Sequence, residues 1–367
     1  MTPAPATAQL CGRLLVGAFD GPTLPPTYAR ALAEGRRGGA ILFRRNMPEL
    51  GPLHELCRAV VRAAEPSGEP PWLGLDEEGG RVRRLPAPAL ALPPARRLGA
   101  PGLEALAERA GDALGAQLAA LGFNIDFAPV LDVDTNPKNP VIGDRAFDTE
   151  PGPVANAALS FYRGLARHVL GCGKHFPGHG DTHLDSHVDL PSIGHDRGRL
   201  EAVELAPFRA AVEAGIDALM TAHIVVRSFD ADRPATLSPA LCAGLLRRSM
   251  GFRGVLFSDD LSMKAVSARY EPGEAAVLAV AAGCDVLLVC GPDETQERAL
   301  EALAREASSS DAFRARCAEA RARALAALSR RPPRPADGEA ELRRAFEGEA
   351  LDDLRRELAR LEAGGAP

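Results

Sequence analysis

Residues 254–259 read GVLFSD, a short apolar run that begins at a glycine and ends in a carboxylate, Asp259. Runs of this kind recur along the chain, and longer helix-like stretches such as residues 103–122 separate them. The other seven are LLVGAF (14–19), AILF (40–43), WLGLD (72–76), NIDFAPV (124–130), GCGKHF (171–176), ALMTAHI (218–224) and DVLLVC (285–290). Continuous apolar runs bounded by glycine and proline are typical of strands that are buried on both faces, as in a parallel sheet.

Eight such runs alternating with helical stretches predict an α/β fold, a (β/α)8 TIM-type barrel rather than an open doubly wound sheet. Five of the runs end in or lead into polar residues that could do chemistry. A barrel would collect these residues in one mouth, because the carboxyl ends of all its strands converge there. They are Asp76, Asp132, Asp134, Lys174, His175, His223 and Asp259.

The chain is predicted to form one catalytic barrel domain over residues 1–330. A proline-rich segment near residue 331, RRPPRPADG, precedes a charged helical pattern that runs to Leu361. We interpret residues 331–367 as a helical C-terminal extension that is packed on the barrel or partly flexible.

The composition narrows the choice of partners and compartment. A net charge of −6 argues against nucleic-acid binding, which usually shows as a basic surplus. We see neither a secretory signal pattern nor an apolar run long enough to span a membrane. The seven cysteines are scattered without a C-x-x-C pair, which favours a reducing compartment over a disulfide framework or a zinc site. We expect a cytoplasmic protein that is a monomer or a weak homodimer.

The densest polar segment is KHFPGHGDTHLDSHVDLP, residues 174–191, which carries a histidine at every fourth position from 175 to 187. On one helix this spacing would align the imidazoles and suggest a metal array. Pro177 and the neighbouring glycines argue against a continuous helix, so we predict a strand end followed by a long loop. The simpler alternative to a functional loop is a polar turn whose side chains satisfy one another.

Within this segment, Asp185 stands two residues before His187. A carboxylate at that spacing can accept the imidazole N–H, fix its tautomer and raise its basicity. Such a pair can donate and recover a proton near neutral pH.

The segment VLFSDDLSM, residues 255–263, places two carboxylates at a strand end. Strand alternation sends Asp259 and Asp260 in opposite directions, so only one should face the mouth, and the sequence alone does not choose. We expect Asp260 to cap the following helix.

Two further segments combine acidic residues with arginine. In LDEEGGRVRRL, residues 75–85, Asp76 ends a strand, and Gly79 and Gly80 would let the backbone approach a ligand. Carboxylate and guanidinium groups together suit a polyhydroxyl substrate. The segment GDRAF, residues 143–147, has the same character, and for both the alternative is a surface salt bridge.

The four segments DEEGGRV, GDRAF, KHFPGHGDT…DSH and FSDDLSM occur in an order that resembles family 3 glycoside hydrolases. The nearest likeness is to the single-domain bacterial β-N-acetylhexosaminidases of peptidoglycan recycling, and it covers roughly residues 10–290. The resemblance implies Asp259 as the nucleophile, His187 as the general acid/base and Asp185 as its orienting partner. It also implies a pocket that binds N-acetylglucosamine in the −1 subsite, with His223 and Met263 assigned less firmly to its lining. The implied binding residues are Asp76, Arg84, Arg145, Lys174 and His175.

The reaction implied is a retaining two-step displacement with no metal or cofactor. The implied substrate is a small carbohydrate or muropeptide, N-acetylglucosaminyl-1,6-anhydro-N-acetylmuramic acid with or without its peptide. Three alternatives stay open: a non-catalytic sugar-binding protein, the same chemistry on other β-glucosides or chitooligosaccharides, and a metal-dependent hydrolase. The metal ligands would then be His175, His179, His183 and Asp181.

Overall fold

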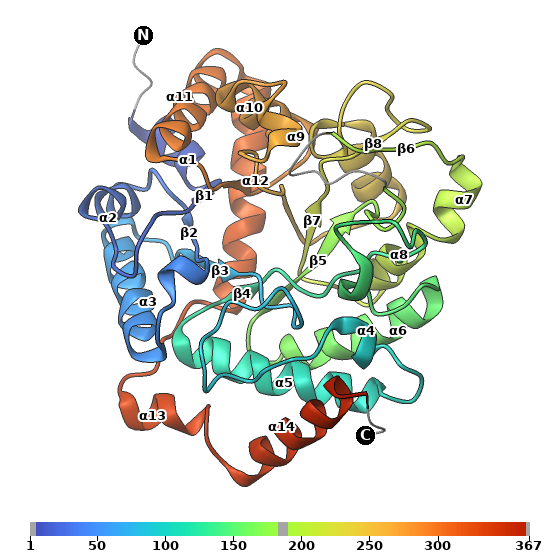
Figure 1. Cartoon of the computed structure of the whole chain (residues 1–367). Coiled ribbons are helices and arrows are strands. Elements are labelled where there is room, and N and C mark those ends of the chain that lie inside the picture. The colour runs from blue at the N-terminus through green and yellow to red at the C-terminus, as the bar shows by residue number, and fades with distance from the viewer. Residues whose placement is uncertain (1–4, 183–189, 365–367) are drawn as a thin grey trace.

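The computed structural model describes residues 5–182 and 190–364. Its main sheet is a ring of eight parallel strands in the order β10-β1-β2-β3-β4-β5-β7-β9 (Figure 1). A parallel bridge between Phe257 and Val286 joins β9 to β10 and completes the ring. The strands are β1 Leu15–Gly17, β2 Gly39–Ile41, β3 Trp72–Leu75, β4 Ile125–Asp126, β5 Leu170–Phe176, β7 Ala218–Thr221, β9 Val255–Phe257 and β10 Leu287–Val289. Each overlaps one of the eight predicted apolar runs, so the predicted (β/α)8 barrel is confirmed.

A helix follows each strand and covers the outside of the barrel (Figure 1). In strand order these helices are α2 Pro26–Ala33, α3 Leu50–Ala64, α5 Glu104–Leu121, α6 Pro151–Leu165, α8 Ala206–Glu213, the π-helix Ala240–Ser249, α10 Pro272–Ala282 and α11 Asp293–Ser309. Helix α1, Pro5–Gly12, precedes β1. Short helices lie between the others: α4 Ala95–Leu98, α7 Arg197–Ala202, α9 Lys264–Ser267 and the 3-10 turns Arg44–Asn46, Glu65–Ser67, Gly143–Arg145 and Ala235–Leu237.

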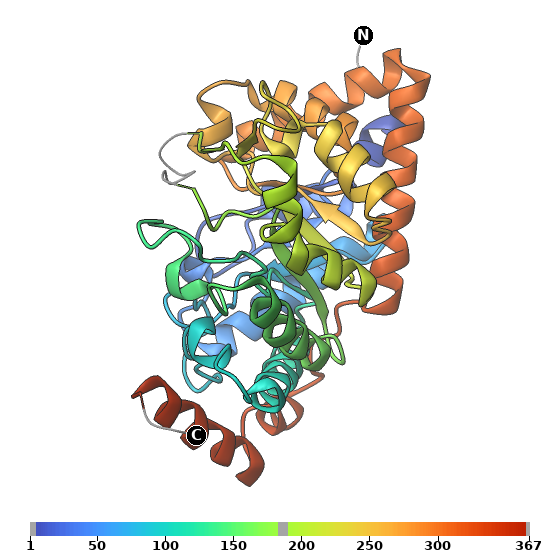
Figure 2. The ribbon, with the colours of Figure 1, turned by 90° about the vertical axis from the view of Figure 1, so that its right-hand side faces the viewer.

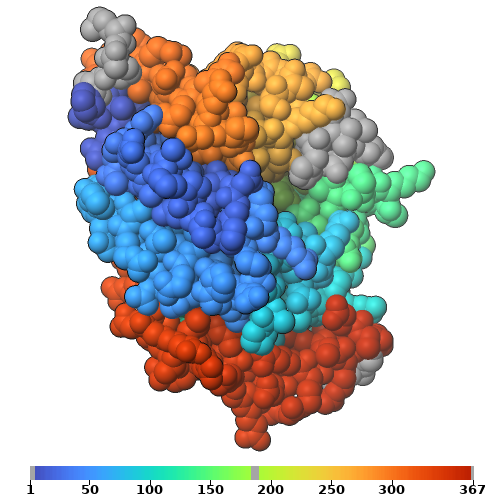
Figure 3. All heavy atoms as spheres, turned by 60° about the vertical axis from the view of Figure 1, so that its left-hand side comes forward, coloured from blue at the N-terminus to red at the C-terminus, as the bar shows by residue number. Residues whose placement is uncertain are grey.

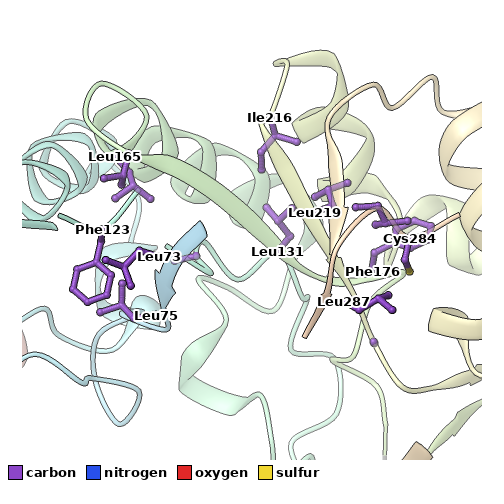
Figure 4. Packing of buried hydrophobic residues seen from close by; sticks show 14 of the residues in the cluster. Leu73, Leu75, Phe123, Leu131, Leu165, Phe176, Ile216, Leu219, Cys284 and Leu287 are labelled. Carbon is purple, nitrogen blue, oxygen red and sulfur yellow. The ribbon is translucent and has the colours of Figure 1, made fainter. Parts of the chain in front are cut away.

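Strand alternation divides the core into two clusters. Val255 and Phe257 belong to the cluster inside the barrel, whereas Leu256 between them packs outward under the helices. Inside, the Phe257 ring meets the rings of Trp72 and Phe127 edge-on, with centroids 5.1 and 5.4 Å apart. Figure 4 shows part of the outer cluster, in which leucines of several strands face the helices.

Helix α12, Asp311–Arg330, closes the N-terminal end of the barrel. Its Ala324, Ala327 and Leu328 belong to the same cluster as the side chains inside the barrel. In Figure 2 this helix runs along one edge of the molecule, across the end where the strands begin. The interior is therefore filled and plugged at one end, which leaves the carboxyl ends of the strands as the open mouth.

The C-terminal extension forms α13 Glu339–Arg344 and α14 Glu349–Glu362, which lie against α5 (Figure 1). Leu354, Leu358 and Leu361 of α14 are buried in the outer cluster. An ion pair of 2.9 Å between Arg109 and Glu357 joins α5 to α14. The division at residue 330 into a domain and an extension stays a prediction.

One small sheet was not predicted. Strand β6, Ser192–Ile193, pairs in parallel with β8, Val225–Val226, outside the barrel. Two-residue strands carry too little pattern to be recognised in a sequence. In the described ranges, no helix combines the length and apolar character that crossing a membrane requires.

Candidate active site

A chain of buried and half-buried charges in the mouth of the barrel connects β5 with the segments that follow β3 and β4. Lys174 Nζ lies 2.6 Å from Asp76 Oδ1 and 2.5 Å from Glu78 Oε1. Glu78 in turn accepts two hydrogen bonds of 2.8 Å from the guanidinium of Arg145. The chain therefore runs from Asp76 through Lys174 and Glu78 to Arg145, and it brings together three of the residues predicted for the −1 subsite.

The members of this chain hold one another in the charged state. Burial by itself raises the pKa of Glu78, but the adjacent Arg145 and Lys174 lower it well below its usual range. Burial likewise opposes the charge on Lys174, whereas Asp76 and Glu78 raise its pKa above the ordinary value. Four fixed charges with few degrees of freedom suit the binding of several hydroxyl groups in one orientation.

Asp132 organises the neighbouring imidazoles. Its carboxylate is completely buried and lies 2.7 Å from Nδ1 of His175. It also accepts a 2.7 Å hydrogen bond from the backbone N–H of His179. Both histidines lower the pKa of Asp132 against the effect of burial. Burial and the nearby His175 lower the pKa of His179 to about 4, so His179 is neutral at physiological pH.

Lys174 and His175 are consecutive, yet each contacts a residue of the mouth: Asp76 and Asp132 respectively. Regular strand alternation would send one of them outward. The pairing of β5 with β7 shifts register between Gly173 and Phe176, so regular alternation does not hold at this point. As predicted, β5 ends at Phe176, and residues 177–182 that follow are not helical.

Asp259 stands two residues after the end of β9, and several of its neighbours favour the ionised carboxylate. Burial raises the pKa of its carboxyl, but His223, His175, the backbone N–H of Asp260 and Lys174 together bring it below the usual value. An ionised carboxylate at a strand end of a barrel mouth is well placed to act as a nucleophile.

Asp260 has a different task from the predicted one. It does not cap α9, whose N-cap position is Met263 without a side-chain cap. Its Oδ1 instead accepts hydrogen bonds of 2.9 Å from the backbone N–H groups of Ser262 and Cys290, which joins the end of β9 to the end of β10. The expectation of a helix cap was wrong because a tight turn, residues 261–263, intervenes before the helix.

His223 is completely buried, and both of its ring nitrogens contact protein groups. Nε2 lies 2.9 Å from the carbonyl oxygen of Asp260, and Nδ1 lies 2.8 Å from Thr236 Oγ1. Since a carbonyl can only accept, Nε2 carries the proton. The imidazole therefore fixes the backbone next to Asp259.

Arg84 and Met263 are both half-buried. Within the described ranges, the guanidinium of Arg84 makes no hydrogen bond or ion pair with a protein side chain. The backbone N–H of Arg84 donates a 2.6 Å hydrogen bond to Glu77 Oε2, and Glu77 is completely buried. Glu77 thus anchors the backbone of the segment that carries the Arg84 guanidinium.

Gly79 and Gly80 adopt positive φ angles of 97° and 52°. A Cβ on Gly79 would lie 2.5 Å from the carbonyl oxygen of Pro93, and one on Gly80 would lie 2.9 Å from Cα of Pro94. These contacts with protein backbone account for both glycines without a ligand.

Asp185, His187 and His183 lie outside the described residues. The described histidines of the segment give no metal ligand set: no group of three or more His, Cys, Asp or Glu residues within residues 5–182 and 190–364 could hold a metal ion. Asp181 instead pairs with His195 and accepts a 3.2 Å hydrogen bond from Thr135 Oγ1.

Two residues of the site were missed at the sequence level. Glu78 stands two positions after Asp76, and strand alternation extended by one step would have placed both on the same face. Glu77 was missed because its contacts are with backbone N–H groups seven and eight residues further on, which only the folded turn reveals.

The fold and the polar mouth define a barrel enzyme, and the comparisons place it among the glycoside hydrolases. Residues 23–327 match the family described as "Glycosyl hydrolase family 3 N terminal domain". A β-hexosaminidase of Neisseria meningitidis serogroup C is 40% identical over 269 residues, which cover 71% of this chain and 73% of that protein. The chain belongs to glycosyl hydrolase family 3.

Two solved structures share the architecture of this chain. A β-N-acetylglucosaminidase of Paenibacillus superposes with a TM-score of 0.90 at 36% identity, covering 97% of this chain and 68% of that one. The NagZ protein of Neisseria gonorrhoeae, in complex with N-trifluoroacetyl-D-glucosamine, superposes with a TM-score of 0.77 at 30% identity. That match covers 95% of this chain and 98% of the Neisseria protein.

Proposed function

We propose that this protein is a retaining exo-β-N-acetylglucosaminidase that releases terminal N-acetylglucosamine from peptidoglycan fragments. The names of its relatives support N-acetylglucosamine as the sugar that is released, since they include β-hexosaminidases and a β-N-acetylglucosaminidase. The single observation that carries the mechanism is the position of Asp259, a carboxylate just beyond the end of β9 in the mouth of the barrel, where His223, His175 and Lys174 lower its pKa although burial raises it.

In the proposed reaction, Asp259 attacks the anomeric carbon while His187 protonates the leaving oxygen. The C–O bond to the leaving group breaks, and a glycosyl ester of Asp259 forms. His187, now neutral, then takes a proton from water, which hydrolyses the ester and regenerates both groups. Asp185 accepts the imidazole N–H of His187 and keeps it in the required tautomer.

The remaining residues of the mouth hold the sugar. Lys174, Asp76 and Arg145 present charged donors and acceptors to its hydroxyl groups, and the half-buried guanidinium of Arg84 adds another donor. His175 is oriented by Asp132 toward Arg145, whose Nη2 lies 3.4 Å from its Nε2. Met263 adds an apolar contact, and His223 acts through the backbone beside Asp259. No metal or cofactor takes part.

The natural substrate proposed is N-acetylglucosaminyl-1,6-anhydro-N-acetylmuramic acid with or without its peptide, which is a cytoplasmic cell-wall fragment. The same chemistry on other β-glucosides or chitooligosaccharides is the second candidate, and the name β-hexosaminidase of the relatives favours chitooligosaccharides, which are built of N-acetylhexosamine. Values of kcat/KM measured side by side on the anhydromuramic disaccharide, a chitooligosaccharide and a β-glucoside distinguish these substrates.

The mechanism is tested by trapping the enzyme with a 5-fluoro N-acetylglucosaminyl donor and mapping the labelled peptide. We expect one label per chain, on Asp259. A label on Asp260 or elsewhere would overturn the assignment of the nucleophile. His187→Ala should be much slower on sugar leaving groups than on activated aryl ones, which need little protonation.

A further inference from the structure

A large cavity lies at the N-terminal end of the barrel, opposite to the mouth. Its volume is about 690 Å³, within the range of roughly 300–1,000 Å³ that is common for ligand sites. Its walls come from the π-helix, the segment that leads into β9, the end of α10 and one face of α12. The hollow of the mouth is a separate one, which the dark blue segments after β1 and the gold segments after β9 border in Figure 3. A ligand in the cavity at the N-terminal end would therefore not compete with the sugar.

Arginine dominates the lining of this cavity. Among the described residues, five arginines and one acidic residue, Glu319, line it, and Asp285 adds one buried carboxylate behind the wall. The cavity thus carries an excess of three positive charges, although the chain as a whole has a net charge of −6. A hollow lined by one sign of charge raises the local concentration of ligands of the opposite sign. The five residues are Arg247, Arg248, Arg253, Arg316 and Arg323.

Three of these guanidinium groups converge on Asp285. Nη2 of Arg247 lies 2.5 Å from Oδ2, whereas Nη2 of Arg316 and Nη1 of Arg323 lie 2.7 and 2.5 Å from Oδ1. The guanidinium of Arg247 also stacks 4.8 Å from the ring centroid of Phe252. Burial and the charges of the other two arginines lower the pKa of Arg247, although the carboxylate raises it. One carboxylate therefore orients three cations but does not balance their charge.

Glu319 is a weaker counter-ion for the same group of cations. Its Oε1 lies 2.6 Å from Nη2 of Arg323, and its Oε2 lies 3.3 Å from Nη1 of Arg316. The Glu319 side chain is 58% exposed, so water screens both ion pairs. A more highly charged anion can therefore replace this carboxylate beside the two arginines.

Two further arginines of the lining stand outside this network. Arg248 lies in the last turn of the π-helix and Arg253 lies just before β9, and both are exposed. Within residues 5–182 and 190–364, neither guanidinium forms an ion pair with a carboxylate. Each carries five N–H donors in a planar fork that fits phosphate oxygens in pairs. The ion pairs of Asp285 give no reason for these two additional charges, whereas an anionic ligand does.

The rest of the wall consists mainly of small residues, which leave the space between the guanidinium groups open. A Cβ added to Gly251 would meet no atom of the described residues within 4 Å. The other small residues of the lining are Ala243, Ala281 and Gly283. The cavity therefore has room for a ligand that reaches several arginines at once.

We propose that this cavity binds a small molecule through a diphosphate group. A single phosphate carries a charge of about −1.5 to −2 at pH 7, so a diphosphate matches the excess of three positive charges more closely. Arg248 and Arg253 supply bidentate hydrogen bonds to its oxygens, and the three arginines on Asp285 supply the surrounding positive field. This inference goes beyond the proposed function and does not depend on it.

Isothermal titration calorimetry of the full chain with inorganic pyrophosphate tests the site. We expect saturable binding of one pyrophosphate per chain, and inorganic phosphate should bind about tenfold more weakly at the same salt concentration. The double variant Arg248→Gln, Arg253→Gln should lose about tenfold or more in affinity for pyrophosphate, and each single variant should lose part of it. Because both side chains are exposed, the variants should keep the wild-type melting temperature without ligand.

The matched control is the double variant Arg62→Gln, Arg344→Gln. It removes the same charge from two exposed positions outside the cavity, and it should keep the wild-type affinity. A parallel titration with ADP distinguishes the sources of the diphosphate. Tighter binding of ADP than of pyrophosphate would show that the cavity holds a nucleotide, and equal binding would show that the phosphates alone are recognised.

Three results would each overturn the site. The first is a wild-type protein that shows no saturable binding of pyrophosphate up to about millimolar concentration. The second is an Arg248, Arg253 double variant that keeps the wild-type affinity. The third is an equal loss of affinity in the Arg62, Arg344 control, which would mean that pyrophosphate responds only to the overall charge of the protein.

Discussion

Glu78 and Lys174 form an ion pair that is almost completely removed from water, with 2.5 Å between Oε1 and Nζ and side chains that are 3% and 2% exposed. Glu78 also accepts both hydrogen bonds from Arg145, so one carboxylate sets the positions of two cations. In the proposed mechanism those cations bind the sugar, whereas Glu78 acts through them. Glu78 is therefore a positioning residue.

Replacing this carboxylate by an amide should damage binding and stability together. In Glu78→Gln the two cations lose their common counter-charge, and breaking a buried ion pair of this kind costs about 3–5 kcal/mol. We expect KM for 4-nitrophenyl N-acetylglucosaminide to rise at least tenfold, with a smaller change in kcat. Steady-state kinetics and urea denaturation measure the two effects. Glu301→Gln, on the exposed face of α11, serves as the control. A Glu78→Gln protein with unchanged KM would contradict the positioning role.

The two neighbouring aspartates after β9 should respond to substitution in opposite ways. Asp259→Ala removes the proposed nucleophile, and we expect kcat/KM to fall at least 10³-fold, about 4 kcal/mol of transition-state stabilisation. Added azide should restore turnover and yield the α-glycosyl azide, because the anion attacks from the side that Asp259 vacates.

Asp260→Asn is the matched comparison. Its remaining carbonyl oxygen can still accept from Ser262 and Cys290, and burial already raises the pKa of Asp260. We expect kcat/KM to stay within about tenfold of the wild type, with no effect of azide. Azide rescue of the Asp260 variant instead of the Asp259 variant would reverse the assignment.

The sequence was sufficient to predict the barrel because a buried parallel strand appears as a continuous apolar run, whichever strands lie beside it. Each of the eight apolar runs is hydrophobic on both faces, since one face meets the interior cluster and the other meets the helices. The same pattern located Asp76, Lys174, His175 and Asp259 at strand ends, and the structure brings them into one mouth.

What the sequence did not predict depends on contacts between distant segments. The pairing of Glu78 with Arg145 spans 67 residues, and no local pattern specifies it. Asp260 was assigned to a helix cap, whereas it joins β9 to Cys290 thirty residues away. The cavity lined by Phe19, Arg45 and Cys290 lies between the segments that follow β1, β2 and β10, which meet only when the barrel closes.

Glu77 should make stability depend on pH. Burial raises the pKa of its carboxyl to about 7, despite the hydrogen bonds that it accepts from the backbone N–H groups of Arg84 and Leu85. In the unfolded chain the group ionises near pH 4.3. Between about pH 4.5 and 7 the native protein therefore holds a proton that the unfolded chain has lost. The free energy of unfolding then falls by about 1.4 kcal/mol per pH unit for this one proton, and the fall ends above pH 7.

Glu77→Gln removes this titration while its amide oxygen can still accept from Arg84 and Leu85. Urea denaturation at pH 5, 6, 7 and 8 measures the free energy of unfolding of both proteins. As the pH rises across this range, the value for the variant should increase relative to that of the wild type by about 3 kcal/mol. Glu301→Gln should follow the wild-type curve. A constant difference between the Glu77 variant and the wild type would show that Glu77 ionises normally in the native state.

Asp285 should carry a large share of the stability at the opposite end of the barrel. It is completely buried just before β10, and its carboxylate binds Arg247, Arg316 and Arg323, the last two from α12. It also accepts a 3.0 Å hydrogen bond from the backbone N–H of Leu256 in β9. One carboxylate thereby joins the helix that plugs the barrel to the pair of strands where the ring closes.

In Asp285→Asn the amide oxygen can still accept from Leu256, but three arginines lose their common counter-charge. The three arginine side chains are only 15–23% exposed, so water cannot solvate their charges in place of the lost carboxylate. We therefore expect the free energy of unfolding to fall by about 3–5 kcal/mol. Asp311→Asn, at an α12 position that is 91% exposed, should change stability by less than about 0.5 kcal/mol. Urea denaturation measures both losses.

Because Asp285 lies at the N-terminal end of β10 and Asp259 at the carboxyl end of β9, kcat of the folded Asp285 variant should stay close to the wild-type value. A variant that is stable but has lost kcat would mean that the plugged end of the barrel controls the geometry of the mouth.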